Sequence, residues 1–267
     1  MIALDLMGFQ GKVVAVTGAA GGIGQELCRY FVEQGAAIAA FDKSPTLTEF
    51  EGTLSGQGAR IDASVVDIGE PAAVKLALAR AVDALGPIDI LINNAGATHN
   101  PVLERTTPES FRDDVNTNVN GAYNCAHAVL PEMTRRRSGV IVNIGSVNGL
   151  AAYGDAAYSA GKAAMISLTR SIAMEYGRHN IRANIVCPGT VRTPIWTERA
   201  SKNPEILAQL ARWYPLRRIV EPMEVVRAVA FLASDAASGI TGAVLPVDCG
   251  LTAGNLVMAR ELTLEDL

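Results

Sequence analysis

A glycine-rich turn between a strand-like run and a helix-like run most constrains the fold of this 267-residue chain. Residues 12–17, KVVAVT, form a short β-branched run that is typical of a buried strand. The turn GAAGGIG at 18–24 follows at once, and residues 25–34 have an amphipathic pattern that ends at Gly35. Glycines let the backbone turn sharply and let a pyrophosphate approach the free amides of a helix N-terminus. The turn therefore predicts a nucleotide-binding unit of the strand–turn–helix kind.

The rest of the chain alternates between strand-like and helix-like runs. Residues 44–58 are polar and interrupted by glycine and proline, so we predict a surface connection with at most a short helix there. Further strands are expected at 36–41, 63–66, 88–92, 139–144, 181–187 and 243–247, and helices at 71–85, 108–137, 156–176 and 222–234. No composition break separates domains. The pattern predicts one doubly wound α/β domain of Rossmann type over residues 1–267, with a mostly parallel seven-stranded sheet flanked by helices.

Composition narrows the class of protein further. The chain is 49% hydrophobic and 19% charged, which supplies a sizeable core and excludes a disordered chain. A net charge of -4 and a pI of about 5.5 argue against a nucleic-acid binder, which usually carries a basic surface. The N-terminus has no basic start before an apolar core, and no window of about 18 apolar residues lacks charge. We therefore expect neither a signal peptide nor a membrane anchor, and a cytoplasmic location.

Cysteine usage fits a reducing compartment. Cys28, Cys125, Cys187 and Cys249 are far apart and form no Cys-x-x-Cys pair, so buried thiols are favoured over disulfides or zinc ligation. No group of His, Cys, Asp or Glu has metal-ligand spacing elsewhere in the chain. We therefore predict a mechanism without a metal.

An acidic residue closes the second expected strand. Asp42 stands where a carboxylate holds the ribose hydroxyls of a bound dinucleotide, about 20 residues after the glycine turn. Its charge would repel a 2′-phosphate, and the glycine turn contains no Arg or Lys that would attract one. Both features predict NAD rather than NADP, although Lys43 is adjacent. A simple turn residue is the alternative interpretation of Asp42.

A tyrosine and a lysine share one face of the expected helix at 156–176. Tyr158 and Lys162 are one helical turn apart. An ammonium beside a phenol favours the phenolate, so we expect the pKa of Tyr158 to fall from about 10. A tyrosine tuned in this way exchanges a proton with an alcohol oxygen. Asn116, Asn118 and Asn120 interrupt the helical pattern of residues 108–137. This indicates either a functional role for these polar side chains or a bend with solvated amides.

These motifs occur together in an order that is more specific than any one of them. Over residues 11–250 the chain resembles the classical short-chain dehydrogenases/reductases. The resemblance rests on Thr17-Gly18-x-x-x-Gly22-x-Gly24, Asp67, Asn93-Asn94-Ala95-Gly96, Asn118, Ser146, Tyr158-x-x-x-Lys162 and Pro188-Gly189 followed by Thr193.

The resemblance implies a role for each matched residue. Tyr158 would be the general acid/base, and Lys162 would lower its pKa and hold the nicotinamide ribose. Ser146 would hydrogen-bond the substrate oxygen, and Asn118 would position a water for proton relay. The implied cofactor contacts, beyond Tyr158 and Lys162, are Gly18, Gly22, Ile23, Gly24, Asp67, Ile68, Asn94, Gly96, Pro188, Gly189, Val191 and Thr193.

The resemblance also implies a homotetramer or homodimer. The apolar runs 225–232 and 243–247 are candidates for burial against a neighbouring subunit. The polar tail 255–267 is a candidate to reach across that neighbour.

Substrate contacts are harder to assign. Segment 190–218 contains Trp196, Trp213 and Tyr214 and is expected to cover the site; a packed loop is the alternative. Ser146 and Tyr158 are twelve residues apart, one fewer than is usual in the family, which leaves the loop 148–157 one residue short. His99 either faces the substrate or is a solvated loop residue. The full set of substrate candidates is Ser146, Asn148, Tyr153, Tyr158, Thr190, Ile195 and Trp196.

The expected activity is NAD-dependent interconversion of a secondary alcohol, such as a small polyol, sugar or cyclic alcohol, and the ketone or lactone. Two alternatives remain open. One is a reductase of the same family that acts on carrier-linked 3-oxoacyl groups. The other is a protein that binds NAD(H) without catalysis, because a fold does not fix a function. The family's usual Asp-Gly-Gly after the last strand reads Asp248-Cys249-Gly250 here, and nothing in the sequence assigns a role to this thiol.

Overall fold

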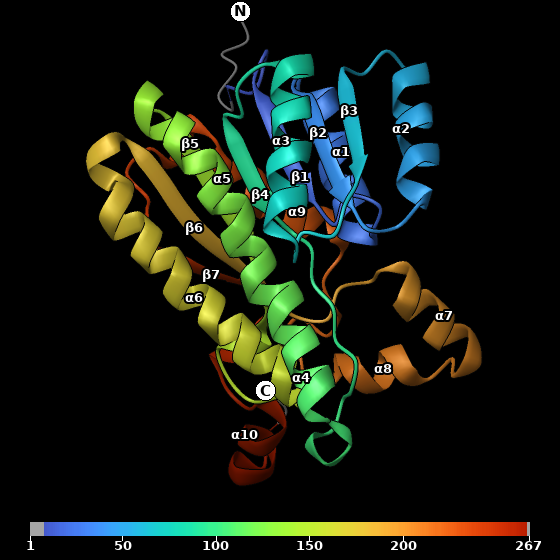
Figure 1. Ribbon diagram of the computed structural model, residues 1–267. Helices are drawn as coiled ribbons and strands as arrows, with labels where there is room; N and C mark the ends of the chain where they lie inside the picture. Colours follow the sequence, from blue (N-terminus) through green and yellow to red (C-terminus); the bar gives the residue numbers. More distant parts are fainter. Residues whose placement is uncertain (1–7, 266–267) are drawn as a thin grey trace, which may run out of the picture.

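The centre of the molecule is a seven-stranded sheet in which every strand pair is parallel (Figure 1). The computed structural model describes residues 8–265, except for the side chain of Ile195. The strand order is β3-β2-β1-β4-β5-β6-β7. The strands are β1 (Val13–Thr17), β2 (Ala37–Asp42), β3 (Ile61–Val65), β4 (Ile90–Asn93), β5 (Gly139–Ile144), β6 (Ile181–Pro188) and β7 (Val244–Val247). The order reverses between β1 and β4, which creates the crevice where ligands bind in such sheets.

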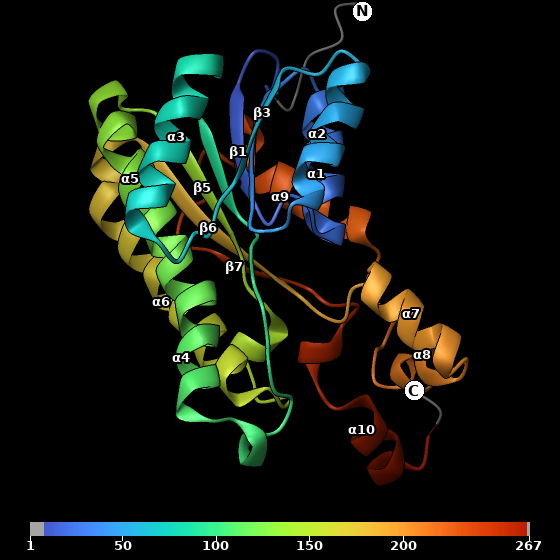
Figure 2. The ribbon, with the colours of Figure 1, turned by 45° about the vertical axis from the view of Figure 1, so that its right-hand side comes forward.

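Helices cover both faces of the sheet (Figure 2). One core lies between the sheet and α1 (Gly22–Glu33), α2 (Thr46–Gly56) and α9 (Pro222–Ala233). The opposite core lies under α3 (Pro71–Leu85), α5 (Gly121–Arg136) and α6 (Ala156–Tyr176). All five residues of β1 are buried, because a central strand of a parallel sheet is covered on both faces. The doubly wound α/β fold predicted from the sequence is confirmed.

Three segments differ from the sequence predictions. Residues 44–58 contain the full helix α2, whose Leu47, Phe50 and Leu54 are buried. Most apolar residues of α9 pack into the core of the same chain, whereas Phe231 in the run 225–232 is exposed. The tail contains α10 (Leu256–Thr263), in which Met258 and Leu262 are exposed.

A five-residue π-helical stretch connects two helices on one side of the site. It spans Asn116–Asn120 and joins α4 (Pro108–Val115) to α5 without a break. Such stretches widen the helix locally and occur often at functional sites. The asparagine cluster that the sequence marked as unfavourable for a helix therefore lies in a continuous but locally widened helix.

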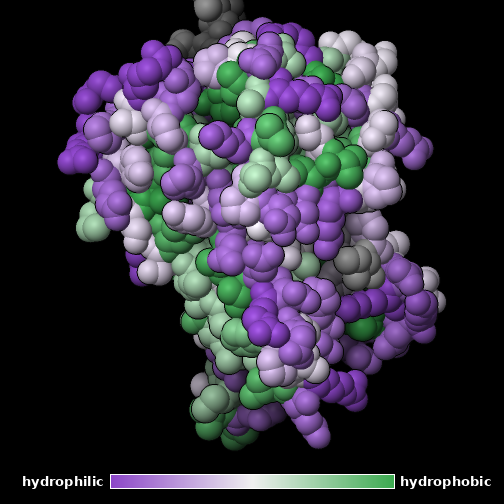
Figure 3. Space-filling model, viewed as in Figure 1, coloured by the Kyte–Doolittle hydropathy of each residue, from purple (hydrophilic) through white to green (hydrophobic). Residues whose placement is uncertain are grey.

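Two short helices project beyond the sheet in the segment predicted to cover the site. They are α7 (Pro194–Lys202) and α8 (Ile206–Ala211), and they lie to one side of the sheet's lower end in Figure 2. Polar residues cover most of the face shown in Figure 3, with apolar residues exposed in smaller groups. Within residues 8–265 no helix is long and apolar enough to cross a membrane.

A glycine contact at the start of α1 provides a test of the fold. A Cβ atom on Gly24 would overlap the carbonyl oxygen of Gly18, whereas one on Gly52 in α2 would meet no atom within 4 Å. We expect Gly24→Ala to lower the free energy of unfolding by about 1–3 kcal/mol because the turn must shift. The matched change Gly52→Ala should raise it by about 0.5–1 kcal/mol. Urea unfolding followed by circular dichroism measures both, and equal effects would contradict the packing described.

Candidate active site

The carboxyl ends of β1 and β4 are tied together at the crevice. The hydroxyl oxygen of Thr17 accepts the backbone N–H groups of Asn94 and Ala95, each at 3.0 Å. The side-chain amide of Asn94 donates to the carbonyl oxygens of Thr17 and Gly18 at 3.0 and 3.1 Å. Asn94 was predicted to contact the ribose, and the N–H donors of its side-chain amide already hold the two strands together.

The glycine turn lies directly against these strand ends. Gly18 has a φ of 66°, in the left-handed region, and a Cβ there would come within 2.8 Å of the Ala95 Cα atom. In the described part of the chain, no side chain caps the N-terminus of α1. The first-turn amides, which include those of Gly22, Ile23 and Gly24, are therefore available to an anion. This arrangement fits the pyrophosphate contact predicted from the sequence.

Asp42 fixes the same turn from the neighbouring strand. One carboxylate oxygen accepts the N–H of Ala20 at 2.9 Å, and the other accepts the N–H of Ser44 at 2.8 Å. Each oxygen keeps capacity for a further hydrogen bond. The two interpretations of Asp42 are therefore compatible, because it organises the turn and still offers acceptors to a ribose.

The two residues predicted to contact adenine differ in exposure. Asp67 is exposed and accepts the N–H of Gly69 at 2.8 Å. Ile68 is buried, and its side chain packs so tightly against Gly121 that a Cβ there would meet the Ile68 Cδ1 atom. Of these two residues, Asp67 is the one whose side chain is exposed.

Ser146, Tyr158 and Lys162 come together at the end of β5. The Ser146 hydroxyl lies close enough to the Tyr158 phenol to lower its pKa. The Lys162 ammonium is buried, donates to the Ile144 carbonyl oxygen at 2.8 Å, and lies 5.4 Å from the centre of the Tyr158 ring. Gly149 lets the loop after Ser146 approach α6, because a Cβ there would lie 2.8 Å from the Lys162 carbonyl oxygen.

Burial dominates the electrostatics of this group. Burial raises the pKa of the Tyr158 phenol, the neighbouring Ser146 hydroxyl lowers it, and the Asp155 carboxylate raises it. Burial also lowers the pKa of Lys162 from 10.5 to about 8. The expectation that the pKa of Tyr158 falls below 10 was wrong for the protein without a bound cofactor. Tyr158 and Lys162 both lose water, and each therefore favours its neutral form. The phenol is held protonated, which suits donation of a proton to a carbonyl oxygen.

Asn118 belongs to the π-helical stretch and lies beside Lys162 of α6. Its fully buried side chain donates to the carbonyl oxygens of Ala97 at 2.7 Å and Asp114 at 2.8 Å. Its Oδ1 atom has no partner among the described residues. A Cβ on Gly96 would lie 2.9 Å from that oxygen and 3.2 Å from the Lys162 Nζ atom. An unpaired buried acceptor beside an ammonium fits the water site that the resemblance implies.

The segment after β6 faces the glycine turn. Thr193 precedes α7, and a Cβ on Gly22 would meet the Thr193 side chain at 3.2 Å and Pro194 at 2.9 Å. Gly189 donates its N–H to the Val247 carbonyl oxygen at 3.0 Å, and Val191 pairs with Val220 in an isolated parallel bridge. The predicted carboxamide segment, which starts at Pro188 at the end of β6, is therefore brought against the turn.

The residues predicted to contact the substrate differ in their exposure and in their hydrogen-bond partners. The Asn148 amide donates to the Gly154 carbonyl oxygen of its own loop at 3.2 Å and to the Ser159 hydroxyl of α6 at 3.1 Å. Tyr153 is 46% exposed, and the Thr190 N–H donates to the hydroxyl of Tyr214 at 3.0 Å.

The aromatic residues of the covering segment also differ from one another. Tyr214 is buried and supports Thr190 instead of lining an open surface. Trp196 and Trp213 each stack with an arginine guanidinium of their own helix region. The Ile195 side chain lies outside the described residues.

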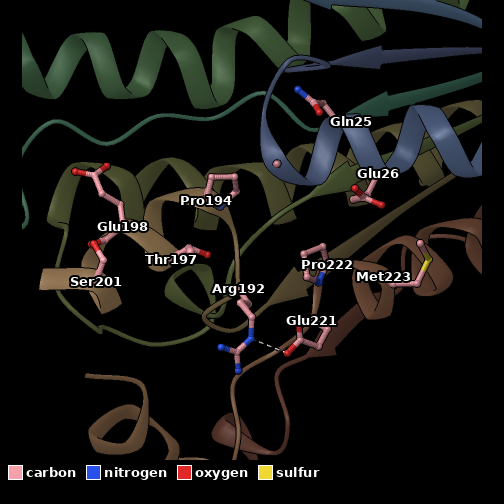
Figure 4. Close-up of a pocket in the computed structure, with 11 residues that line it drawn as sticks. Gln25, Glu26, Arg192, Pro194, Thr197, Glu198, Ser201, Glu221, Pro222 and Met223 are labelled. Carbon is pink, nitrogen blue, oxygen red and sulfur yellow. Dashed lines mark hydrogen bonds and ion pairs between the residues drawn. The ribbon is translucent and has the colours of Figure 1, made fainter. Parts of the chain in front are cut away.

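A cavity of 780 Å³ adjoins the glycine turn (Figure 4). It lies between α1, α7 and the start of α9, with Gly22 and Gln25 on one side. Arg192 and Glu221 form an ion pair of 2.8 Å at its edge. The sequence did not single out this pair, which joins residues far apart in the chain. The cavity does not include Tyr158 or Lys162, so it marks the outer side of the crevice.

Sequence reasoning also missed the partner of His99. The His99 Nδ1 atom lies 2.5 Å from a carboxylate oxygen of buried Asp114, one helical turn before Asn118. His99 is therefore not a simple solvated loop residue. No sequence signal announces the pair, because a loop brings the two residues together.

Within residues 8–265, no group of three or more His, Cys, Asp or Glu side chains is arranged to hold a metal ion. All four cysteines are free thiols, and burial raises the pKa of Cys187, beneath Gly145, to about 11. At neutral pH this thiol is therefore uncharged.

Comparison with known proteins agrees with this geometry. A family model described as "Enoyl-(Acyl carrier protein) reductase" matches residues 18–252. An uncharacterized oxidoreductase of Schizosaccharomyces pombe is 40% identical over 261 residues, which cover 97% of this chain and 98% of the relative. The chain belongs to the short-chain dehydrogenase/reductase family, and it is an oxidoreductase of that family.

Solved structures agree as well. A short-chain dehydrogenase/reductase family oxidoreductase from Burkholderia thailandensis is 47% identical, with a TM-score of 0.89, over 96% of this chain and 98% of that one. The structure titled "ElxO with NADP Bound" is 27% identical, with a TM-score of 0.86, over 91% of this chain and 99% of that one. The family uses a nicotinamide cofactor, and this relative is described with NADP bound.

The buried lysine gives a pH prediction. Because the folded-state pKa of Lys162 is lowered to about 8, its charge penalises the folded state below that pH. The penalty disappears as the pH rises from about 8 to 10.5, which adds about 3 kcal/mol of stability from this group. NMR of ¹³C-labelled lysine should show a Cε resonance that titrates near pH 8. It should be absent in Lys162→Met and retained in Lys75→Met, at an exposed lysine of α3; persistence in Lys162→Met would refute the assignment.

Proposed function

We propose that this protein is an NAD-dependent dehydrogenase that interconverts a secondary alcohol and its ketone, or a sugar hemiacetal and its lactone. The observation that carries the proposal is the close pair of Ser146 and Tyr158, in which the serine hydroxyl lowers the pKa of the phenol. It lies beside the buried Lys162 ammonium, at the sheet edge that also holds the glycine turn. A small polyol, sugar or cyclic alcohol is the proposed substrate.

Each residue has a defined task in this reaction. Bound nicotinamide supplies the hydride acceptor or donor. Tyr158 gives its phenolic proton to the carbonyl oxygen in reduction and takes the hydroxyl proton in oxidation. The Ser146 hydroxyl donates to the same oxygen and stabilises the charge that develops there. Lys162 offers a cationic donor to the cofactor ribose and a route for the proton toward the acceptor oxygen of Asn118.

NAD is the proposed cofactor because of Asp42. Its carboxylate stands at the end of β2, tied to the glycine turn, where a 2′-phosphate would meet a negative charge. The NADP-bound relative is a reason to test this choice directly. We also propose a homodimer or homotetramer, for which the half-exposed outer strand β7 offers a surface.

Reduction of carrier-linked acyl groups is the second candidate. The matching family model, which is named for a reductase of acyl-carrier-linked groups, supports it. That reaction would favour NADPH and a 3-oxoacyl thioester over NAD and an alcohol, so cofactor titration and substrate choice separate the two functions.

Replacement of the tyrosine tests the proposed chemistry. We expect Tyr158→Phe to lower kcat by about 10²- to 10⁴-fold with an alcohol and NAD, because the proton donor and acceptor is lost. NADH binding, followed by fluorescence, should stay unchanged. The matched change Tyr123→Phe, at an exposed tyrosine of α5, should alter neither.

Three outcomes would contradict the proposal. Near-normal turnover in Tyr158→Phe would exclude the mechanism. Turnover by the wild type with NADPH and a thioester alone would favour the carrier-linked reductase. NADH binding without turnover of any substrate would favour a non-catalytic binding protein.

A further inference from the structure

An Asp–His pair lies next to the proposed catalytic group and has no role in the chemistry described above. The His99 Nδ1 atom is 2.5 Å from Asp114 Oδ1, and the His99 backbone N–H is 3.4 Å from Asp114 Oδ2. The Asp114 side chain is 2% exposed, whereas the His99 side chain is 45% exposed. A buried carboxylate is costly unless it is paired. Among the described residues, His99 is the side chain that pairs it.

The pair fixes the orientation of the imidazole. A carboxylate only accepts hydrogen bonds, so the Nδ1 atom of His99 carries the proton and donates it. Its other ring nitrogen, Nε2, is then the one left for a further partner. A buried carboxylate that holds one nitrogen of a histidine is a general way to present the other nitrogen in a fixed position.

The loop that carries His99 borders the substrate side of the site. Gly96, three residues earlier, lies against Asn118 and the Lys162 ammonium. Thr98 donates to the Asp155 carboxylate at 3.3 Å, and Asp155 donates its N–H to the Pro101 carbonyl oxygen at 3.0 Å. Asp155 directly precedes α6, which carries Tyr158. The loop of His99 therefore meets the loop before α6, whose Asp155 carboxylate acts on the Tyr158 phenol.

The charges around the pair indicate the chemistry of its partner. Asp114 and Asp155 are both acidic, and the described hydrogen bonds and ion pairs of this loop include no Lys or Arg. A substrate anion that approached His99 would be repelled by these two carboxylates. A neutral hydroxyl or carbonyl oxygen can exchange a hydrogen bond with imidazole without that penalty.

We propose that His99, held by Asp114, is a specificity-determining residue that hydrogen-bonds a second, neutral oxygen of the substrate. This inference rests on the proposed function and narrows the substrate class to alcohols with a further hydroxyl or carbonyl group near the reacting carbon. A site built to hydrogen-bond such a group discriminates strongly against an analogue that lacks it.

Paired substrates test the inference. Steady-state kinetics with NAD compare trans-cyclohexane-1,2-diol with cyclohexanol, and butane-2,3-diol with butan-2-ol. In His99→Leu, KM for the diols should rise by about ten- to a hundredfold, with little change for the mono-alcohols. His99→Asn should restore part of the diol preference because it keeps a polar side chain. The matched change His179→Leu, beyond the far end of α6, should leave both substrate classes unchanged.

A second variant covers the possibility that His99→Leu leaves Asp114 unpaired and fails to fold. The double change His99→Leu/Asp114→Leu removes both partners and should fold while losing the same diol preference. Equal losses on diols and mono-alcohols, or an unchanged diol preference, would overturn the inference and leave the proposed function intact. If the wild-type protein binds NADH but oxidises none of the four alcohols, the proposed function fails and this inference fails with it.

Discussion

The hydrogen bonds between Thr17 and Asn94 are the interaction on which the site depends. Parallel strands end at the same edge of a sheet, but their polar ends are left without ladder partners there. Here the Thr17 hydroxyl and the Asn94 amide satisfy those groups and draw β1 and β4 together. Gly18 then fits against Ala95, which places the first turn of α1 opposite the catalytic residues.

Loss of water decides the charge states at the site. Lys162 sits on a helix face buried by β5 and by the loop at Gly149, and one backbone carbonyl accepts from its ammonium. Because this bond and a long contact with the Met165 sulfur do not replace full hydration, the pKa of Lys162 falls to about 8. The pKa of the Tyr158 phenol rises for the same reason. A sequence pattern shows which groups are neighbours, but how much water each one loses depends on the whole fold.

Local patterns predicted most of the fold. Strand and helix alternation predicted the seven-stranded sheet, because buried parallel strands are short apolar runs. The helix α2 was expected to be short at most, since Pro45, Gly52 and Gly56 look like loop residues. Its buried Leu47, Phe50 and Leu54 nevertheless follow helical spacing.

The candidate site likewise contains residues that the sequence predicted and contacts that it did not. Ser146, Tyr158, Lys162 and Asn118 were predictable because motifs fix them on adjacent elements. The contacts of His99 with Asp114 and of Arg192 with Glu221 were not predictable, because they depend on how long loops fold back. The contacts of the loop 148–157 were not predictable either. Its Asn148 amide turned inward to Gly154 and Ser159, a choice set by the local backbone rather than by a residue pattern.

The central claim is that Tyr158 and its neighbours direct hydride transfer between an alcohol carbon and the nicotinamide. The most direct measurement follows the hydrogen itself, using a diol with deuterium on its carbinol carbons, NAD, and mass spectrometry of the recovered cofactor. The account predicts that the cofactor gains a single deuterium from each alcohol oxidised. Consumption of the alcohol with no deuterium on the cofactor would contradict it.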